Sequence, residues 1–158
     1  MVYSLLGSNI LESSATHIEL TGLEEKNFLT IIFHAKHAGS GNMSARFRFN
    51  DSDSGYSSAE TEDYGTRYTQ VNDTNTENLT GTRTSGASMV IFHVINVSGQ
   101  HHPIFSNGTS KSSGSGGMRG KQVVAVWNNT ARITEVKAYI ESGAEYGVGA
   151  YLMVFGSD

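Results

Sequence analysis

The sequence of 158 residues contains no cysteine and only one proline. Without cysteine, the fold can depend neither on disulfide bonds nor on thiolate ligands to a metal ion. Proline interrupts the hydrogen-bond ladder of a sheet, so its near absence leaves room for unbroken strands. No stretch carries the i, i+3, i+4, i+7 apolar stripe of an amphipathic helix; the nearest approach, Ala138–Tyr146, is broken by Ser142-Gly143.

Charged side chains are also scarce, at 16% of residues against about 25% in a typical soluble protein. The 11 basic and 15 acidic residues give a net charge of −4, and the basic residues never form a run. A nucleic-acid-binding protein needs rows of cations along the phosphates, so we exclude that class. Much of the surface must therefore consist of Ser, Thr, Asn and Gly.

Long hydrophobic runs are absent as well. No segment approaches the ~18 consecutive apolar residues of a membrane span. The first residues, MVYSLLGSNILESS, have neither the basic start nor the long apolar stretch of a signal peptide. We therefore expect a chain that is made in a cytoplasm, is not exported through a secretory pathway and does not enter a membrane.

The strongest β signal lies at the C-terminal end of the sequence. Three apolar runs, Gln122–Trp127, Arg132–Ile140 and Ala150–Phe155, are separated by an Asn-Asn pair and by a glycine-containing segment. Asn and Gly tolerate the left-handed backbone conformations that turns require. The pattern predicts three strands connected as two successive hairpins. Because the last run ends close to the C-terminus, we expect that strand to lie inside a sheet.

The N-terminal half also alternates between apolar and polar residues. Residues 1–14 show no sustained alternation, and we expect them to form an N-terminal arm. Thr16–Leu20 predicts an edge strand, and the run FLTIIFHAKH, which starts at Phe28, predicts a central one. In Met43–Phe49 two arginines alternate with apolar residues and should lie on the opposite face. The apolar face of the central strand comprises Leu29, Ile31, Phe33 and Ala35.

The middle of the sequence gives weaker patterns. Asp51–Thr82 is rich in Asp, Ser, Gly, Asn and Thr, which predicts a long loop with one weak strand near Thr66–Val71. Ser88–Val97 is apolar on both faces, as expected for a buried strand. Gln100–Phe105 predicts a short strand, and the Ser/Gly-rich tract Ser106–Gly117 predicts a flexible loop.

About eight strands with short connections and no helix predict an all-β protein, an antiparallel two-sheet sandwich of the jelly-roll type. Its length fits one domain over residues 1–158. A sandwich of this size has a single core between its sheets. The second apolar face of Ser88–Val97 therefore needs cover, either from a loop or from a neighbouring subunit.

Catalytic patterns are missing. The sequence has no cysteine nucleophile, and its Gly114-Ser115-Gly116 lies in the predicted flexible tract rather than at a strand-to-helix elbow. Glu60 and Glu62 fall in a predicted solvated loop, where the buried environment of a catalytic acid is not expected. We therefore expect no enzyme activity, no catalytic residue and no cofactor.

One segment has some of the spacing of a calcium loop. Asp51, Asp53 and Gly55 lie two residues apart, and Glu62 occupies the twelfth position counted from Asp51. No helix is predicted on either side of this segment, and its Gly falls at the fifth place. An Asx-rich turn is the favoured interpretation.

The histidines allow a second hypothesis about metal binding. His34 and His37 would point to opposite faces of a strand, and His101-His102 would need a third ligand to bind zinc. We expect these residues to lie at the surface or at subunit contacts, and we expect no metal.

Aromatic residues and arginines are the candidates for recognition. Trp127 at the end of its strand is either a stacking platform for a carbohydrate or, as we favour, part of the core. The tyrosines of the predicted long loop either contact a partner or anchor the loop. The arginines of Met43–Phe49 either contact a partner or lie in solvent. The candidate contact residues are Arg46, Arg48, Tyr56, Tyr64 and Tyr68.

The order of several short motifs resembles that of a widespread family of phage virion proteins. Ile133-Thr134-Glu135-Val136, the segment from Gly143 to Gly149 and Val154-Phe155-Gly156 are similar to the family's I-T-x-I strand, G-x-x-x-x-G turn and final L-Y-G. Ala45–Asp51 is similar to its L-R-F-N-G-D strand and turn. Phe replaces the usual Tyr in the last motif. The resemblance covers both ends of the chain and is weak between Thr66 and Gly120.

The resemblance implies a virion location. The function that follows is a capsid decoration (cement) protein on the outside of the shell, with the major capsid protein and identical chains of a homotrimer as partners. A second hypothesis is a receptor-binding, carbohydrate-binding module of a tail or head fibre. A third class is an enzyme or lectin-like carbohydrate-binding module, which only Trp127 and the tyrosines support. The fold cannot choose among them, because sandwiches host many functions.

Overall fold

The computed structural model describes residues 2–39, 43–62, 69–72, 83–84, 87–111, 118–140 and 144–158. Within these ranges every regular element is a β-strand, so no described helix could cross a membrane. The strands are β1 (Ser4–Ile10), β2 (His17–Leu20), β3 (Phe28–Lys36), β4 (Met43–Phe49), β5 (Tyr56–Glu62), β6 (Thr69–Asn72), β7 (Arg83–Thr84), β8 (Ala87–Ile95), β9 (His102–Lys111), β10 (Met118–Trp127), β11 (Val136–Ile140) and β12 (Tyr151–Ser157).

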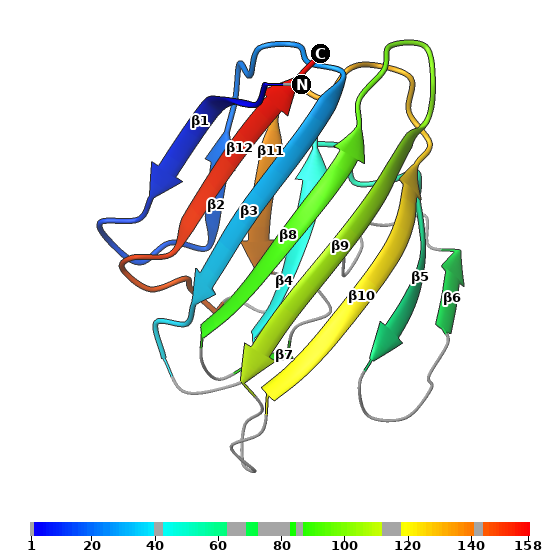
Figure 1. Ribbon diagram of the computed structural model, residues 1–158. Helices are drawn as coiled ribbons and strands as arrows, with labels where there is room; N and C mark the ends of the chain where they lie inside the picture. Colours follow the sequence, from blue (N-terminus) through cyan, green and yellow to red (C-terminus); the bar gives the residue numbers. More distant parts are fainter. Residues whose placement is uncertain are drawn as a thin grey trace.

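The strands form two layers (Figure 1). The large sheet has eight strands in the order β1-β12-β3-β8-β9-β10-β5-β6, and the small sheet has four in the order β2-β11-β4-β7. Every strand pairing is antiparallel. These observations confirm the predicted all-β, two-sheet sandwich. The C-terminal strand β12 lies between β1 and β3, as expected from its position in the sequence.

The pairing pattern is that of a jelly roll. β1 pairs with β12, β2 with β11, β3 with β8 and β4 with β7, so each pair is nested inside the previous one along the chain. Successive pairs alternate between the two sheets, which is how one long antiparallel ribbon wraps into a jelly roll. β9, β10, β5 and β6 are additional to this scheme and extend the large sheet beyond β8.

Alternating side chains of both sheets fill the space between them. On β3 the buried positions are those predicted from the sequence, and on β4 the apolar residues lie inside while the arginines point outward. Phe47 of the small sheet contacts Phe33 and Phe92 of the large sheet, with ring centroids 5.1 and 4.4 Å apart. Trp127 is fully buried beside Phe49, at 5.7 Å. The core interpretation of Trp127 is confirmed, and the carbohydrate platform is wrong because no face of the indole reaches solvent.

The predicted C-terminal hairpins are wrong, although the three strands exist. β10 pairs with β9 and β5, β11 pairs with β2 and β4, and β12 pairs with β1 and β3. Residues 132–135, predicted as part of a strand, form a loop that crosses from one sheet to the other. Turn-forming residues between two strands mark a change of direction, but they do not specify that the two strands pair.

The predicted N-terminal arm is also wrong, because Ser4–Ile10 forms the edge strand β1. Its register against β12 shifts between Leu5 and Gly7, at a β-bulge or similar irregularity. An extra residue in one strand moves the following side chains to the other face. The apolar residues of this segment therefore do not alternate regularly in the sequence, although they belong to a strand.

Two predicted loops contain strands. Tyr56–Glu62 (β5) lies in the expected long loop and pairs along its whole length with β10. β9 continues through Ser106–Lys111, where a flexible tract was predicted, because it pairs with β8 on one side and β10 on the other. Ser106 and Gly108 are buried there, and their small size suits these inward positions of the sheet. The weak strand predicted near Thr66–Val71 corresponds in part to β6.

Candidate interaction surfaces

The outward side chains of six neighbouring strands in the large sheet form a continuous surface, which we call the apolar sheet face. Strand registers place these side chains in three rows across β1, β12, β3, β8, β9 and β10. The first row is Leu5, Phe155, Thr30, His93, Phe105 and Val124; the second is Ser8, Met153, Ile32, Ile91, Asn107 and Gln122; the third is Ile10, Tyr151, His34, Met89, Thr109 and Gly120.

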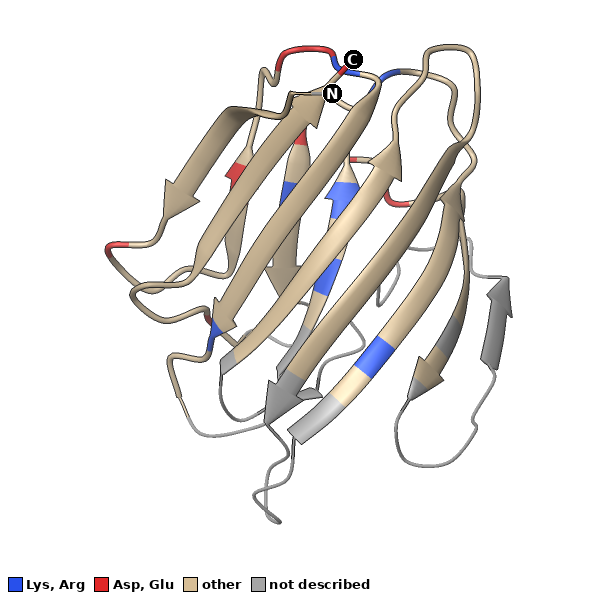
Figure 2. Cartoon of the chain, viewed as in Figure 1, with Lys and Arg blue, Asp and Glu red and all other residues tan. Residues whose placement is uncertain are grey.

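The apolar sheet face combines exposure with an almost complete lack of charge. Leu5, Ile10, Phe105 and Val124 each leave 48–56% of their surface exposed. Among the outward side chains that the structure describes on these six strands, Lys36 at the end of β3 is the single Lys, Arg, Asp or Glu. Figure 2 shows the strands of this sheet almost without charged residues. Large exposed apolar patches of this kind mark binding surfaces.

The outward face of the small sheet has the opposite chemistry, and we call it the charged sheet face. Its described side chains lie in two rows set by the pairing of β11 with β2 and β4. One row contains Glu19, Lys137 and Arg48, and the other contains His17, Tyr139 and Arg46. Arg46 and Arg48, both candidates from the sequence, are thus brought beside Tyr139 and Lys137.

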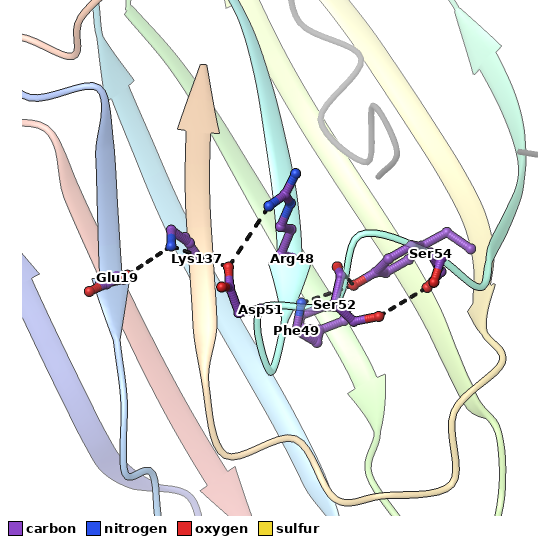
Figure 3. Close-up of polar contacts among 8 residues, drawn as sticks. Glu19, Arg48, Phe49, Asp51, Ser52, Ser54 and Lys137 are labelled. Atoms are coloured by element: carbon purple, nitrogen blue, oxygen red, sulfur yellow. Dashed lines mark hydrogen bonds and ion pairs between the residues drawn. The ribbon is translucent and has the colours of Figure 1, made fainter. Parts of the chain in front are cut away.

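Intramolecular contacts hold several of these charges in place (Figure 3). Nζ of Lys137 lies 3.4 Å from Glu19 Oε2 and 3.2 Å from Asp51 Oδ1. Partial burial by itself would lower the pKa of Lys137, but the hydrogen bonds and charges of Asp51 and Glu19 outweigh burial and raise it. Arg48 is fixed by its guanidinium, which lies over the ring of Tyr139 with Cζ 4.5 Å from the centroid.

The segment considered for calcium is a tight turn at the edge of the charged sheet face. Asn50 and Asp51 both have left-handed backbones, with φ of 50° and 51°, and Ser52 N donates to Phe49 O at 3.0 Å. Asn and Asp tolerate that conformation better than most residues, which confirms the Asx-rich turn. The Asp51 carboxylate faces two cations, Lys137 and, at 3.9 Å, Nη1 of Arg48. Among the described residues no group of three His, Cys, Asp or Glu could hold a metal ion.

Tyr56 anchors the turn and is not a contact residue, so this candidate from the sequence is wrong. Its ring is only 1% exposed, its Oη accepts a hydrogen bond from Phe49 N at 2.9 Å and donates one to Ser52 O at 3.3 Å. Of the two roles expected for the tyrosines, Tyr56 has the anchoring one. Tyr64 and Tyr68 lie outside the described residues, and their role stays a prediction.

The histidines do not form a pair for metal binding. His34 points outward from β3 and stacks on Tyr151, with ring centroids 5.1 Å apart. His102, expected at the surface, is instead fully buried against Trp127. Its Nδ1 lies 3.1 Å from the Ile95 carbonyl oxygen and its Nε2 2.8 Å from that of Ala131. Both ring nitrogens therefore face backbone acceptors and not a ligand.

Two asparagines that sequence reasoning missed tie the crossing loop 128–135 to the sheets. Asn96, fully buried at the end of β8, donates to Ile133 O and to Lys26 O and accepts from Ile133 N at 2.7 Å. Asn50, at the end of β4, accepts from the backbone N of Thr134 at 2.9 Å. The available signal was an asparagine directly after a long apolar strand, where a side chain can satisfy loop backbone groups.

Comparisons with known proteins do not assign a family. No family model matches the sequence and no curated protein matches it. One solved structure, described as "Catalytic domain of PdAgaC", is 6% identical, with 96% of this chain and 74% of that chain covered and a TM-score of 0.28. A TM-score this low supports no inference about fold or function. The resemblance of the end motifs to phage virion proteins stays a prediction.

Proposed function

We propose that this protein is a virion structural protein, a capsid decoration protein that binds the outside of a phage shell as a homotrimer and acts by binding rather than by catalysis. The observation that carries the proposal is the presence of two outward faces of opposite chemistry on one jelly roll. Two such faces suit a protein with two kinds of neighbour: identical chains and the shell. The resemblance of both chain ends to phage virion proteins supports the same function.

The charged sheet face is the proposed shell contact. Arginine forks bind carboxylates with two parallel hydrogen bonds, so Arg46 and Arg48 suit acidic side chains of the major capsid protein. Arg48 already lies over Tyr139 and is tethered by Asp51, so it has less side-chain entropy to lose on binding than an unrestrained arginine. The partly buried position of these side chains favours a specific contact over a diffuse electrostatic one.

The position and copy number of the protein in purified particles test this proposal. We expect many copies on the outer surface of the shell, with the charged sheet face toward the major capsid protein in a cryo-electron microscopy map. A few copies at a tail or fibre tip would support the receptor-binding alternative instead. Absence from the particles would overturn both virion functions.

A further inference from the structure

The apolar sheet face is large enough to serve as an interface between proteins. Strands lie about 4.8 Å apart and same-face residues about 6.8 Å apart, so the three rows of six positions project onto about 600 Å². A fourth, shorter row, which contains Ile95, Pro103 and Val126, enlarges this surface. Stable interfaces bury about 800 Å² of accessible surface per partner, and a corrugated face buries more accessible surface than it projects.

We infer that the apolar sheet face is the contact surface between copies of this chain, so that its occupants are the same faces of two further copies gathered around a threefold axis. This inference rests on the self-association in the proposed function and assigns its interface. Because Lys36 is the single Lys, Arg, Asp or Glu at the described outward positions, identical faces can meet with little like-charge repulsion. The charged sheet face carries Arg46, Arg48 and Lys137 against Glu19 and Asp51, so two copies could meet there only with their opposite charges aligned.

The chemistry of the face argues against a lipid surface as its occupant. Membrane-surface elements combine an apolar face with several Lys or Arg residues that contact anionic headgroups. Here the described rim offers Lys36, and the positions between the apolar residues are filled by His34, His93, Asn107 and Gln122. Hydrogen-bonding side chains within an apolar patch are typical of interfaces between proteins, where they fix the register of the two surfaces.

A matched pair of valine substitutions tests the inference. Val124 lies on the apolar sheet face and Val148 in the turn before β12, and both side chains are 53% exposed. At micromolar concentration we expect light scattering to give about 51 kDa for the wild-type protein, three times 17.0 kDa. V124E should weaken association more than 100-fold and leave a 17.0 kDa monomer with an unchanged β circular dichroism spectrum, whereas V148E should keep the oligomer.

A second measurement keeps the test valid if V124E does not fold. The chain contains no cysteine, so F105C and V148C each carry a single thiol. Phe105 is 48% exposed on the apolar sheet face, and its thiol variant should react with a maleimide at least tenfold more slowly than V148C at micromolar protein. Dilution that dissociates the oligomer should remove the difference, since the protection comes from the neighbouring copy.

The outcomes separate this inference from the proposed function. A wild-type oligomer that survives V124E and leaves F105C unprotected would overturn the interface but not self-association. A wild-type monomer would overturn both the interface and the homotrimer, while attachment to particles would still be measurable. A dimer with protected F105C would uphold the interface and refute the trimer.

Discussion

The outward faces of the two sheets take their side chains from strands with the same two-residue alternation, yet their composition differs. The described outward positions of the large sheet include one charged residue across six strands, Lys36. Those of the small sheet include Glu19, Lys137, Arg46 and Arg48 on three strands. Figure 2 shows the same contrast, with charge gathered on β2, β11 and β4.

The inward faces show that the fold does not cause this difference. Both sheets turn apolar side chains inward, and their rings meet in one shared core, as Phe47 and Phe92 do. Folding requires those inward residues but leaves the outward ones free to vary. The charged sheet face satisfies part of its charge within the chain through Lys137 and Asp51. The apolar sheet face leaves apolar side chains such as Phe105 and Val124 about half exposed in the part of the chain that the structure describes, and this difference motivates the separate binding roles that we propose for the two faces.

The largest change in the free energy of unfolding is expected at the crossing loop 128–135, which connects the large sheet to the small sheet. Asn96→Ala removes three hydrogen bonds and leaves Ile133 N and its carbonyl oxygen without their buried partner. The free energy of unfolding should fall by about 2–4 kcal/mol, measured by urea denaturation. Asn128→Ala, an exposed asparagine in the same crossing loop, is the control and should change it by less than about 0.5 kcal/mol. Equal effects of the two substitutions would refute the role of Asn96.

The sequence predicted core residues best in strands that have one solvent-exposed face and one buried face. Alternation in Phe28–Lys36 and Met43–Phe49 assigned the core residues and placed Arg46 and Arg48 outward. Ser88–Val97 was expected to be buried on both sides, but Met89 is 41% exposed on the outward face. The sequence of a single strand does not show which other strands pair beside it and add their outward side chains to the same face. The apolar sheet face became visible only when pairing aligned six strands from distant parts of the chain.

Other features could not be predicted because they depend on long-range pairing. The bulge in β1 hid its alternation, and β9 continues as a strand through Ser- and Gly-rich sequence because neighbours on both sides satisfy its backbone. His102 was expected at the surface, and Tyr56 was left open between a contact role and an anchoring role, yet each finds buried backbone partners. These partners are Phe49 and Ile95 at strand ends and Ala131 in the crossing loop, which only the tertiary fold brings close.

High pH should destabilise the fold through the two tyrosines that are buried between the sheets. Burial raises the pKa of Tyr56 and Tyr146, and a buried tyrosinate is disfavoured. The unfolded chain releases these protons above about pH 10 and the folded chain does not, so their contribution is intact below about pH 10 and is lost as pH rises. The loss should reach about 1.4 kcal/mol per tyrosine for each pH unit, measured by denaturation between pH 9 and 11.

Two phenylalanine variants provide the comparison for the pH experiment. Tyr146 Oη is buried without a hydrogen-bond partner among the described atoms, so Tyr146→Phe removes an ionisable group and no such bond. This variant should lose less stability than the wild type at high pH. Tyr56→Phe should likewise lose less stability than the wild type as pH rises, although at neutral pH it gives up the hydrogen bonds with Phe49 N and Ser52 O. The same pH profile for Tyr146→Phe and the wild type would contradict the assignment.

Substitutions on the charged sheet face should affect attachment to particles without affecting self-association. Replacing Arg46 and Arg48 together by alanine should weaken attachment to particles about 10- to 30-fold, because charge-assisted contacts with carboxylates are lost. The oligomer mass should not change, since the apolar sheet face is untouched. Lys36→Ala is the control for removal of an exposed cation elsewhere. Cosedimentation with particles that lack the protein measures the attachment, and a change of oligomer mass in the double variant would refute the division between the faces.

The smallest effect is expected within the charged sheet face itself. Lys137→Gln removes the cation between Glu19 and Asp51, and leaves Asp51 with Arg48 at 3.9 Å as its remaining ion pair among the described residues. Glu19 and Asp51 are 39% and 57% exposed, so solvent screens the pair and the loss should not exceed about 1 kcal/mol. The difference from wild type should shrink in 1 M NaCl, where charges are screened over about 3 Å. Urea denaturation at low and high salt measures it, with Lys36→Gln as the matched control, and a loss that persists at high salt would show that Lys137 acts through packing of its aliphatic stem instead.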